Sequence, residues 1–430
     1  MRLASSRLDA HDEGAALEAL HAAGQTDGLP VVIPTPARVE RMVIASGLDP
    51  DLSLGAVGPN QGVATVEKVC IAAVMAGCLA DHLPVVIASV KAICDERFDT
   101  TEWQSTTHAI SPLIIVNGPA RDSCGGIAGG FGALGPGHRA NASIGRAIRL
   151  ELTNIGGARP GIGDMALLGH GAKFGAVLAE KEDESPWEPW SASLGFDADA
   201  SIVTVIGTEP PHSVISVGDA DDPSAPDRLL GSLAATIANL GSNNAFFRQG
   251  AVVVALNPDH AQALAGAGHT RRSIQEALHA RAANPVSRLR ALNPIYAGRG
   301  ADDTLVHATA RPDDIIVIVA GGGGIYSAVF PSWAPGPTRI RSSLSRSTST
   351  RPARYRDDCP TPDLRWRHVQ CRPCGRPRAG EGRPPPRHGD QPDGPGPERT
   401  TGRRRGTARD PARLAARRTD GGERHDAYTG

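Results

Sequence analysis

Acidic, amide and histidine side chains flank the apolar segments of this sequence and are its first candidates for chemistry. Glu180 and Glu182 stand two residues apart, so on a strand they would share a face and could act as an acid and a base or bind a cation. In a loop the same carboxylates would simply be solvated. His108 precedes the apolar run 113–116, and Asn117 follows it, where open α/β sheets bind ligands. His108, Glu180 and Glu182 are therefore catalytic candidates, and Asn117 is a ligand-binding candidate.

A glycine-rich segment, residues 125–137, is a candidate anion site because it holds seven glycines in thirteen residues. Residues 130–135 match G-x-G-x-x-G, but no strand precedes them and Pro136 separates them from the next helix, so the context of a dinucleotide-binding loop is missing. Asn141 is expected to cap that helix, with Arg139 just before the cap, which suits a phosphate or a carboxylate. The alternative is a surface loop whose arginine pairs with a nearby acid. Arg139 and Asn141 are thus ligand-binding candidates.

The cysteines give little support for a reactive thiol or a metal site. There are seven, an odd number without the density of a disulfide scaffold, so reduced thiols are expected. Cys78 is expected in the core, whereas Cys124 is more accessible by context but has no base placed beside it. Cys371 and Cys374 form a single CxxC pair, so no metal site is predicted. Residues 1–335 contain no HExxH, GxxxxGK[ST] or GxSxG motif, and no cofactor is assigned.

Strands and helices alternate in the pattern that must position these residues. Unbroken aliphatic runs predict strands at residues 113–116, 201–206, 251–256 and 315–319. Between them, apolar residues at helical spacing predict helices that begin after Thr65, Leu83, Asn141 and Thr270 and others over 226–239 and 258–265. The fold class is therefore α/β, with a largely parallel sheet covered by helices on both faces. We expect an N-terminal extension over 1–24, an α/β domain over 25–195 and a second α/β unit over 196–335.

The net negative charge of residues 1–335 excludes two classes of partner. Residues 1–335 carry 23 Lys and Arg against 35 Asp and Glu, whereas nucleic-acid and anionic-membrane binders need a basic face. No run reaches the roughly 18 apolar residues of a membrane span. The N-terminus lacks the apolar core and cleavage site of a secretory signal. We therefore expect a cytoplasmic protein with no membrane or nucleic-acid partner.

Residues 336–430 differ sharply in composition from the rest of the chain. They hold 22 Arg, 13 Pro and no Lys, against 11 acidic residues, and they lack apolar periodicity, so a disordered tail is predicted. Abundant Arg without Lys is also typical of out-of-frame translation of a GC-rich gene. We favour such a frameshift product over the alternative, a genuine basic arm that recruits an acidic or nucleic-acid partner.

Several segments together resemble a bacterial family associated with UGSC-type (seleno)proteins. The similar segments are GLPVVIPTPARVERMV (28–43), ATVEKVCIAAVMAGC (64–78), TTHAISPLIIVNGP (106–119), GPGHRANASIGRA (135–147), NIGGARPG (154–161) and AEKEDESPWEP (179–189). The resemblance implies an intracellular bacterial protein linked to thiol or selenol chemistry, and it supplies no catalytic assignment. This chain has no Cys-Gly-Ser-Cys counterpart of the selenocysteine motif, and it diverges after Trp333.

Taken together, these features predict an enzyme that acts on a small anionic or carbonyl-bearing metabolite. Its site would be formed by the strand end within 106–118, the loop 125–141 and the segment 180–188. The alternative is a non-catalytic subunit or binding protein that pairs with a separate redox protein. Residue types and spacing leave both the reaction and the choice between these two functions open.

Overall fold

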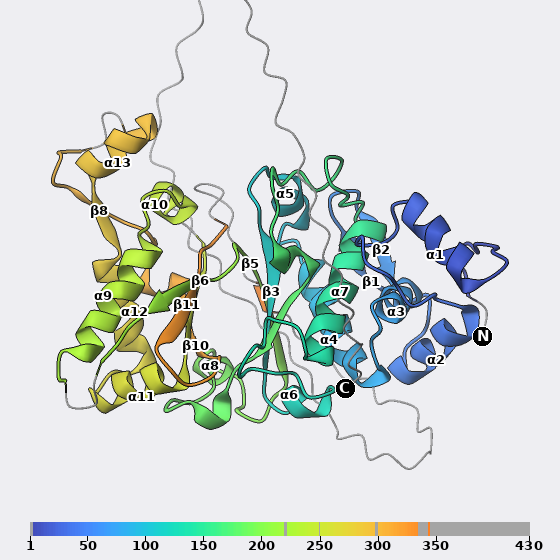
Figure 1. Cartoon of the computed structure of the whole chain (residues 1–430), viewed down its shortest axis with the longest axis horizontal. Helices are drawn as coiled ribbons and strands as arrows, with labels where there is room; N and C mark the ends of the chain where they lie inside the picture. Colours follow the sequence, from blue (N-terminus) through green and yellow to red (C-terminus); the bar gives the residue numbers. More distant parts are fainter. Residues whose placement is uncertain (1–2, 219–221, 249, 297–299, 334–342, 345–430) are drawn as a thin grey trace, which may run out of the picture. The chain divides into compact units, whose positions relative to one another are not determined.

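Two four-stranded sheets pack face to face, and helices cover the outer face of each (Figure 1). The computed structural model describes residues 3–218, 222–248, 250–296, 300–333 and 343–344. These residues all lie in one unit, Met1–Cys374, and the second unit, Gly375–Gly430, is outside the described residues. The predicted tail is therefore outside the described residues except at 343–344.

The first sheet has the strand order β12-β5-β3-β4, and the second has the order β10-β7-β11-β6. In each sheet two neighbouring strands are parallel, β3 with β4 and β7 with β10, and the remaining pairs are antiparallel. The bounds are β3 Ser111–Asn117, β4 Ala176–Ala179, β5 Ile202–Thr208, β12 Ser343–Leu344, β6 His212–Ile215, β7 Val252–Leu256, β10 Ile315–Val319 and β11 Tyr326–Phe330. The α/β class is confirmed at this level, but the sheets are mixed rather than largely parallel.

Alternation along the strands shows what covers each face. In β3, Leu113 and Ile115 point to the core between the two sheets, whereas Ile114 and Val116 point to the core under the helices. In β10, Ile316 belongs to the core between the sheets, whereas Val317 belongs to the core under the helices. An unbroken aliphatic run therefore correctly indicates burial on both faces. The expectation of helices on both faces is wrong because the second cover of each sheet is the other sheet.

The helices form two outer layers, and several short elements lie at the ends of the sheets. On the first sheet lie α4 Leu83–Ile93 and α7 Arg139–Asn154, with α3 Val66–Met75 packed on them and α2 Pro36–Ser46 on α3; on the second lie α9 Ala225–Ile237 and α12 Arg271–Arg281, with α11 Pro258–Gly266 against α9. The other elements are α1 Glu13–Ala22, β1 Ser53–Val57, β2 Gly62–Thr65, α5 Thr100–Ser105, α6 Ala120–Ser123, α8 Trp190–Ser193, α10 Asn243–Phe247, β8 Ala283–Pro285, α13 Val286–Leu292 and β9 Leu305–His307, with 3₁₀ turns at Ala80–His82, Gly171–Phe174, Glu182–Glu184, Pro294–Tyr296 and Pro312–Asp314. None of the helices in the described part of the chain is long and apolar enough to cross a membrane.

Local capping explains where several helices begin. Thr65 accepts a hydrogen bond from the Lys68 N–H at the start of α3, and Thr270 caps α12 with the help of Ser273, as predicted. The expected cap at Asn141 is wrong, because α7 begins at Arg139 after an N-cap at His138. The predicted division at 195/196 does not separate the sheets, since β5 follows it and yet completes the first sheet.

Candidate functional site

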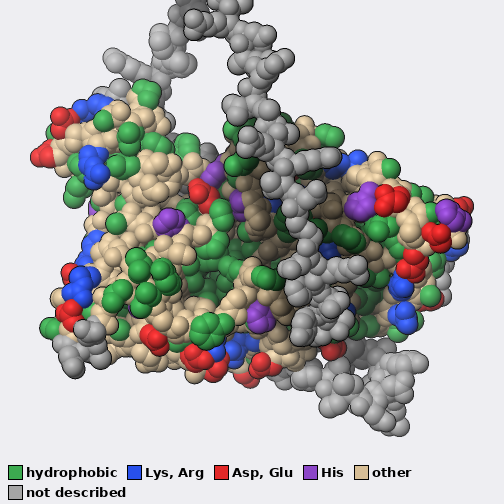
Figure 2. Space-filling model, in the orientation of Figure 1, with side chains coloured by type: hydrophobic (Ala, Val, Ile, Leu, Met, Phe, Trp, Pro, Cys, Tyr) green, Lys and Arg blue, Asp and Glu red, His purple; other side chains and the backbone are tan. Residues whose placement is uncertain are grey.

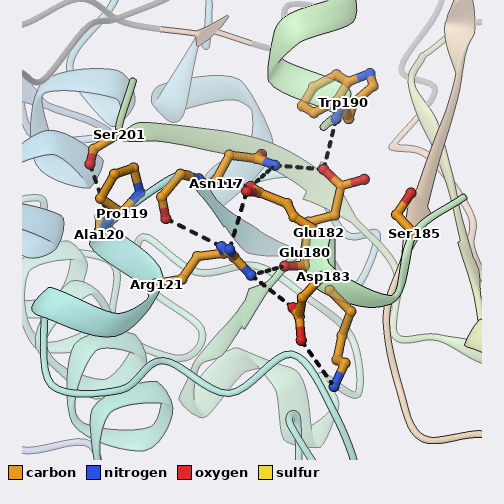
Figure 3. A network of polar contacts seen from close by, with 12 residues as sticks. Asn117, Pro119, Ala120, Arg121, Glu180, Glu182, Asp183, Ser185, Trp190 and Ser201 are labelled. Carbon is orange, nitrogen blue, oxygen red and sulfur yellow. Dashed lines mark hydrogen bonds and ion pairs between the residues drawn. The ribbon is translucent and has the colours of Figure 1, made fainter. Parts of the chain in front are cut away.

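Three of the sequence candidates meet where β3 and β4 end (Figure 3). The Asn117 amide nitrogen donates to Glu180 Oε2 at 2.5 Å and to Glu182 Oε1 at 2.9 Å. The pairing of Val116 with Ala179 explains the meeting, because parallel neighbours end at the same edge of a sheet. The residues that follow the two strands are therefore brought side by side.

Glu180 is fully buried and tied to the second half of the chain. Its Oε1 atom lies 3.0 Å from Arg271 Nη2, and their side chains are 0% and 8% exposed. The Trp190 N–H donates to Oε2 at 2.9 Å. Burial raises the pKa of the Glu180 carboxyl, and the Arg271 guanidinium, the Trp190 N–H and the Asn117 amide act against that rise. The arrangement is that of a buried ion pair whose charges are matched by close donors.

All three guanidinium nitrogens of Arg271 donate to acceptors of the protein. Its Nε donates to the Val317 carbonyl at 2.9 Å, and its Nη1 donates to the Glu188 carbonyl at 2.7 Å. The guanidinium also lies 5.9 Å from the centre of the Trp187 ring. Arg271 therefore ties α12 and β10 to the segment that follows β4.

Glu182 and Arg121 form the more exposed side of this network. The Gly118 N–H donates to Glu182 Oε1 at 2.7 Å, and Arg121 Nη2 lies 3.3 Å from Oε2. Arg121 also reaches Asp183 at 3.2 Å and two backbone carbonyls. Asn117 Oδ1 is the buried exception, with no hydrogen-bond partner among the described residues. Glu180 and Glu182 thus share one amide, and both carboxylates are held by donors rather than solvated.

Asn141 and Arg139, the two ligand-binding candidates from the glycine-rich region, are both hydrogen-bonded to backbone groups. Asn141 is buried; its Oδ1 accepts from the Ala128 N–H at 2.9 Å, and its Nδ2 faces the carbonyls of Ala128, Ala133 and Val177 at 2.8–3.2 Å. Arg139 is exposed and donates to the Gly77 carbonyl at 3.1 Å, just past the end of α3. Asn141 fixes the loop that was expected to bind an anion, and a ligand role for either residue stays a prediction.

His108 lies at the opposite end of β3 from this network. At about 3.3 Å per residue, β3 alone separates the two groups by about 20 Å. The single site predicted from 106–118, 125–141 and 180–188 is therefore divided between two ends of the sheet. The prediction that His108 shares a site with Glu180 and Glu182 is therefore wrong.

The neighbours that His108 does have are a carboxylate and an amide from distant parts of the chain. His108 Nε2 lies 2.9 Å from Glu209 Oε1, and Nδ1 lies 2.8 Å from the Asn243 amide nitrogen. The side chains of His108 and Glu209 are 22% and 26% exposed, so solvent reaches the pair. Figure 2 shows histidine and acidic side chains close together beside α10, at the edge of a recess in the surface.

Unsatisfied polar groups lie in the chain on both sides of His108. The Gln104 amide and the Ser111 hydroxyl are buried, and neither has a hydrogen-bond partner among the described residues. His170 lies near enough for His108 and Glu209 to affect its pKa, which burial and then Lys173 lower. The end of β3 that carries His108 thus has an imidazole–carboxylate pair that solvent reaches, and the chain near it holds buried polar groups without a partner among the described residues.

The described cysteines do not supply an activated thiol. Burial raises the pKa of Cys70, Cys94 and Cys124 to about 12, and it raises the pKa of Cys78 as well. A thiolate is the nucleophilic form, so these groups are inert near neutral pH. Across the described part of the chain, no three His, Cys, Asp or Glu side chains gather as metal ligands.

Comparison with known proteins adds no assignment: the chain matches no protein-family model, no curated protein and no solved structure. The resemblance to the family associated with UGSC-type (seleno)proteins therefore stays a prediction.

Proposed function

We propose that this chain is an intracellular enzyme that moves a proton on a small carbonyl-bearing or anionic metabolite, with His108 as the acid–base group. The observation that carries the proposal is the accessible contact of 2.9 Å between His108 and Glu209, with Asn243 on the other ring nitrogen. Histidine changes its charge near neutral pH, and a carboxylate partner both orients the ring and stabilises its protonated form.

The two contacts favour one assignment of the imidazole proton. If Nε2–H donates to Glu209, Nδ1 is left as the acceptor that faces the Asn243 amide. A substrate proton would pass to Nδ1 when the substrate replaces that amide, and the resulting imidazolium would stay paired with Glu209.

Any thiol or selenol in this reaction would come from the substrate or from a partner. The raised pKa values of the four described cysteines argue against a thiolate supplied by residues in the cores. This view retains the link to thiol chemistry that the family resemblance implies without assigning it to a residue of this chain.

The proposal is tested by a thermal-shift screen followed by turnover assays. Small 2-oxo acids, aldehydes and carboxylic acids are screened against the full chain, because a ligand that binds only the folded state raises its melting temperature. Compounds that stabilise are then assayed for turnover. His108→Gln is expected to lower kcat by about 100-fold or more, the usual contribution of a general acid or base. The matched control is His21→Gln, which replaces a histidine bonded to Thr26 far from the pair in sequence and should leave kcat unchanged.

A binding subunit that pairs with a separate redox protein is the second candidate, and one observation favours it. Leu167 and Leu168 are 85% and 97% exposed on a loop whose Leu167 N–H donates to the Thr107 carbonyl, beside His108. Adjacent leucines exposed to this degree are typical of a contact surface. Saturable ligand binding without turnover, or stabilisation only by a protein partner, would favour this function over the enzyme.

A further inference from the structure

Ser327 and His260 form a close hydroxyl–imidazole pair on the second sheet. Ser327 lies at the start of β11, and His260 lies in the first turn of α11, the helix that follows β7. The Ser327 Oγ atom is 2.7 Å from His260 Nδ1, and the two residues are 4% and 8% exposed. A serine within hydrogen-bond reach of a histidine is the arrangement of a nucleophile with its general base.

The other contacts of the pair set the direction of this hydrogen bond. His260 Nε2 is 3.2 Å from the Ser216 carbonyl, which only accepts, so Nε2 carries the proton of the neutral ring and Nδ1 is the acceptor. Burial lowers the pKa of His260, which favours the neutral ring. The Asn257 N–H donates to Ser327 Oγ at 3.1 Å. The serine hydroxyl therefore accepts from the backbone and donates its own proton to an imidazole that a carbonyl holds in place.

A glycine-rich loop adjoins the pair. Residues 321–324 are four glycines that follow β10, and Asn257 follows β7, so both lie at the carboxyl ends of parallel neighbours, where α/β sheets bind ligands. The Asn257 amide nitrogen donates to the carbonyls of Gly324 and Tyr326 at 2.8 and 2.7 Å and so holds the loop beside the serine. Gly323 and Gly324 are exposed, and within the described part of the chain their N–H groups have no hydrogen-bond partner. Backbone N–H groups of this kind can stabilise an oxyanion.

We propose that Ser327 and His260 form a second catalytic site, which hydrolyses a short-chain acyl ester. Ser327 Oγ bonds to the ester carbonyl carbon while its proton passes to His260 Nδ1; the alcohol then leaves with that proton, and the acyl group stays on Oγ. Water cleaves the acyl-serine by the same proton transfers, which yields the carboxylic acid and restores the hydroxyl. The low exposure of the pair favours a short acyl group. The site uses no residue of the His108 group, so it stands or falls separately from the proposed function.

Acetylation of the full chain by p-nitrophenyl acetate tests this site directly. Attack by Ser327 releases p-nitrophenolate and leaves an acetyl group on Oγ, which peptide mass spectrometry locates. We expect a burst of p-nitrophenolate, with the acetyl group on Ser327, followed by slower hydrolysis. Acetyl groups found only on other residues would overturn the proposal, and this result needs no variant.

Substitutions of the pair test whether His260 is the base. Ser327→Ala should abolish the burst, and His260→Gln should slow it by about 100-fold or more, each with the circular dichroism of the wild type. Ser327→Cys keeps a nucleophile of similar size and should still be acetylated, which separates loss of the nucleophile from loss of folding. The matched control is Ser273→Ala, because Ser273 also lies near a histidine, 3.2 Å from His269 Nδ1, but its hydroxyl donates to the Thr270 carbonyl. The control should keep the burst, whereas a burst at the wild-type rate in His260→Gln would contradict the proposal.

Discussion

The polar groups at the two ends of β3 differ in how exposed they are and in how fully they are hydrogen-bonded. At the C-terminal end, Glu180 is fully buried and its two oxygens receive three donors from Arg271, Trp190 and Asn117. At the N-terminal end, the His108–Glu209 pair is about a quarter exposed and is flanked by buried groups without partners. A buried network whose charged groups are matched costs stability when it is broken, and in this one Asn117 Oδ1 lacks a partner among the described residues. Because solvent reaches the His108–Glu209 pair, chemistry is expected there rather than at the buried network.

The largest predicted effect comes from breaking the buried network. Arg271→Ala leaves the Glu180 carboxylate buried without its cation, which is expected to destabilise the chain by about 3–5 kcal/mol. Urea unfolding monitored by tryptophan fluorescence measures the change. The adjacent Arg272→Ala is the control: Arg272 is 54% exposed, so its loss should cost less than about 1 kcal/mol. Similar losses in the two variants would contradict the structural role of the buried pair.

A smaller loss is expected at Asn141, a buried residue that was first considered a ligand-binding candidate. Asn141→Ala removes the side-chain contacts to Ala128, Ala133 and Val177 and leaves buried backbone groups unpaired, at a cost of about 2–3 kcal/mol. Thermal unfolding measures it. Asn154→Ala removes one exposed contact to the Gln25 carbonyl and should have a much smaller effect. If Asn141 instead binds a ligand, the variant will unfold like the wild type and lose ligand stabilisation.

The smallest predicted effect is a gain of stability rather than a loss, and it concerns the buried carboxyl of Glu151. Glu151 is 2% exposed, one of its oxygens has no partner among the described residues, and burial raises its pKa well above the usual 4.5. Because the folded state holds this proton more tightly, the wild type loses stability as the pH rises above about 4.5. Glu151→Gln should therefore raise the melting temperature at pH 7, and its advantage should shrink towards pH 4.5.

The sequence predicted the positions of the strands better than their directions. The aliphatic runs of β3, β5, β7 and β10 are visible because both faces of each strand are buried, but hydrophobicity does not say whether a helix or another sheet provides the cover. The antiparallel pairing of β5 with β3 had no local signal, because residues 180–201 between β4 and β5 are long enough for a parallel crossover.

The candidate site was predicted in part, for reasons that differ from residue to residue. Asn117 and Glu180 were placed together correctly because both follow strands that are parallel neighbours. Glu209 and Asn243 were missed because they stand 101 and 135 residues from His108 and carry no local motif. Asn141 was mistaken for a cap because its type suits one, whereas its amide reaches back to the preceding loop. Only tertiary pairing determines these contacts.

The most direct test compares the two ends of β3 in a single assay. Turnover of a substrate found in the thermal-shift screen is measured for the wild type, His108→Gln and Glu182→Gln, each confirmed as folded by circular dichroism. We expect His108→Gln to lower kcat by about 100-fold or more while Glu182→Gln keeps kcat within about threefold of the wild type. Full activity in His108→Gln together with a large loss in Glu182→Gln would place the chemistry at the buried network and contradict this account.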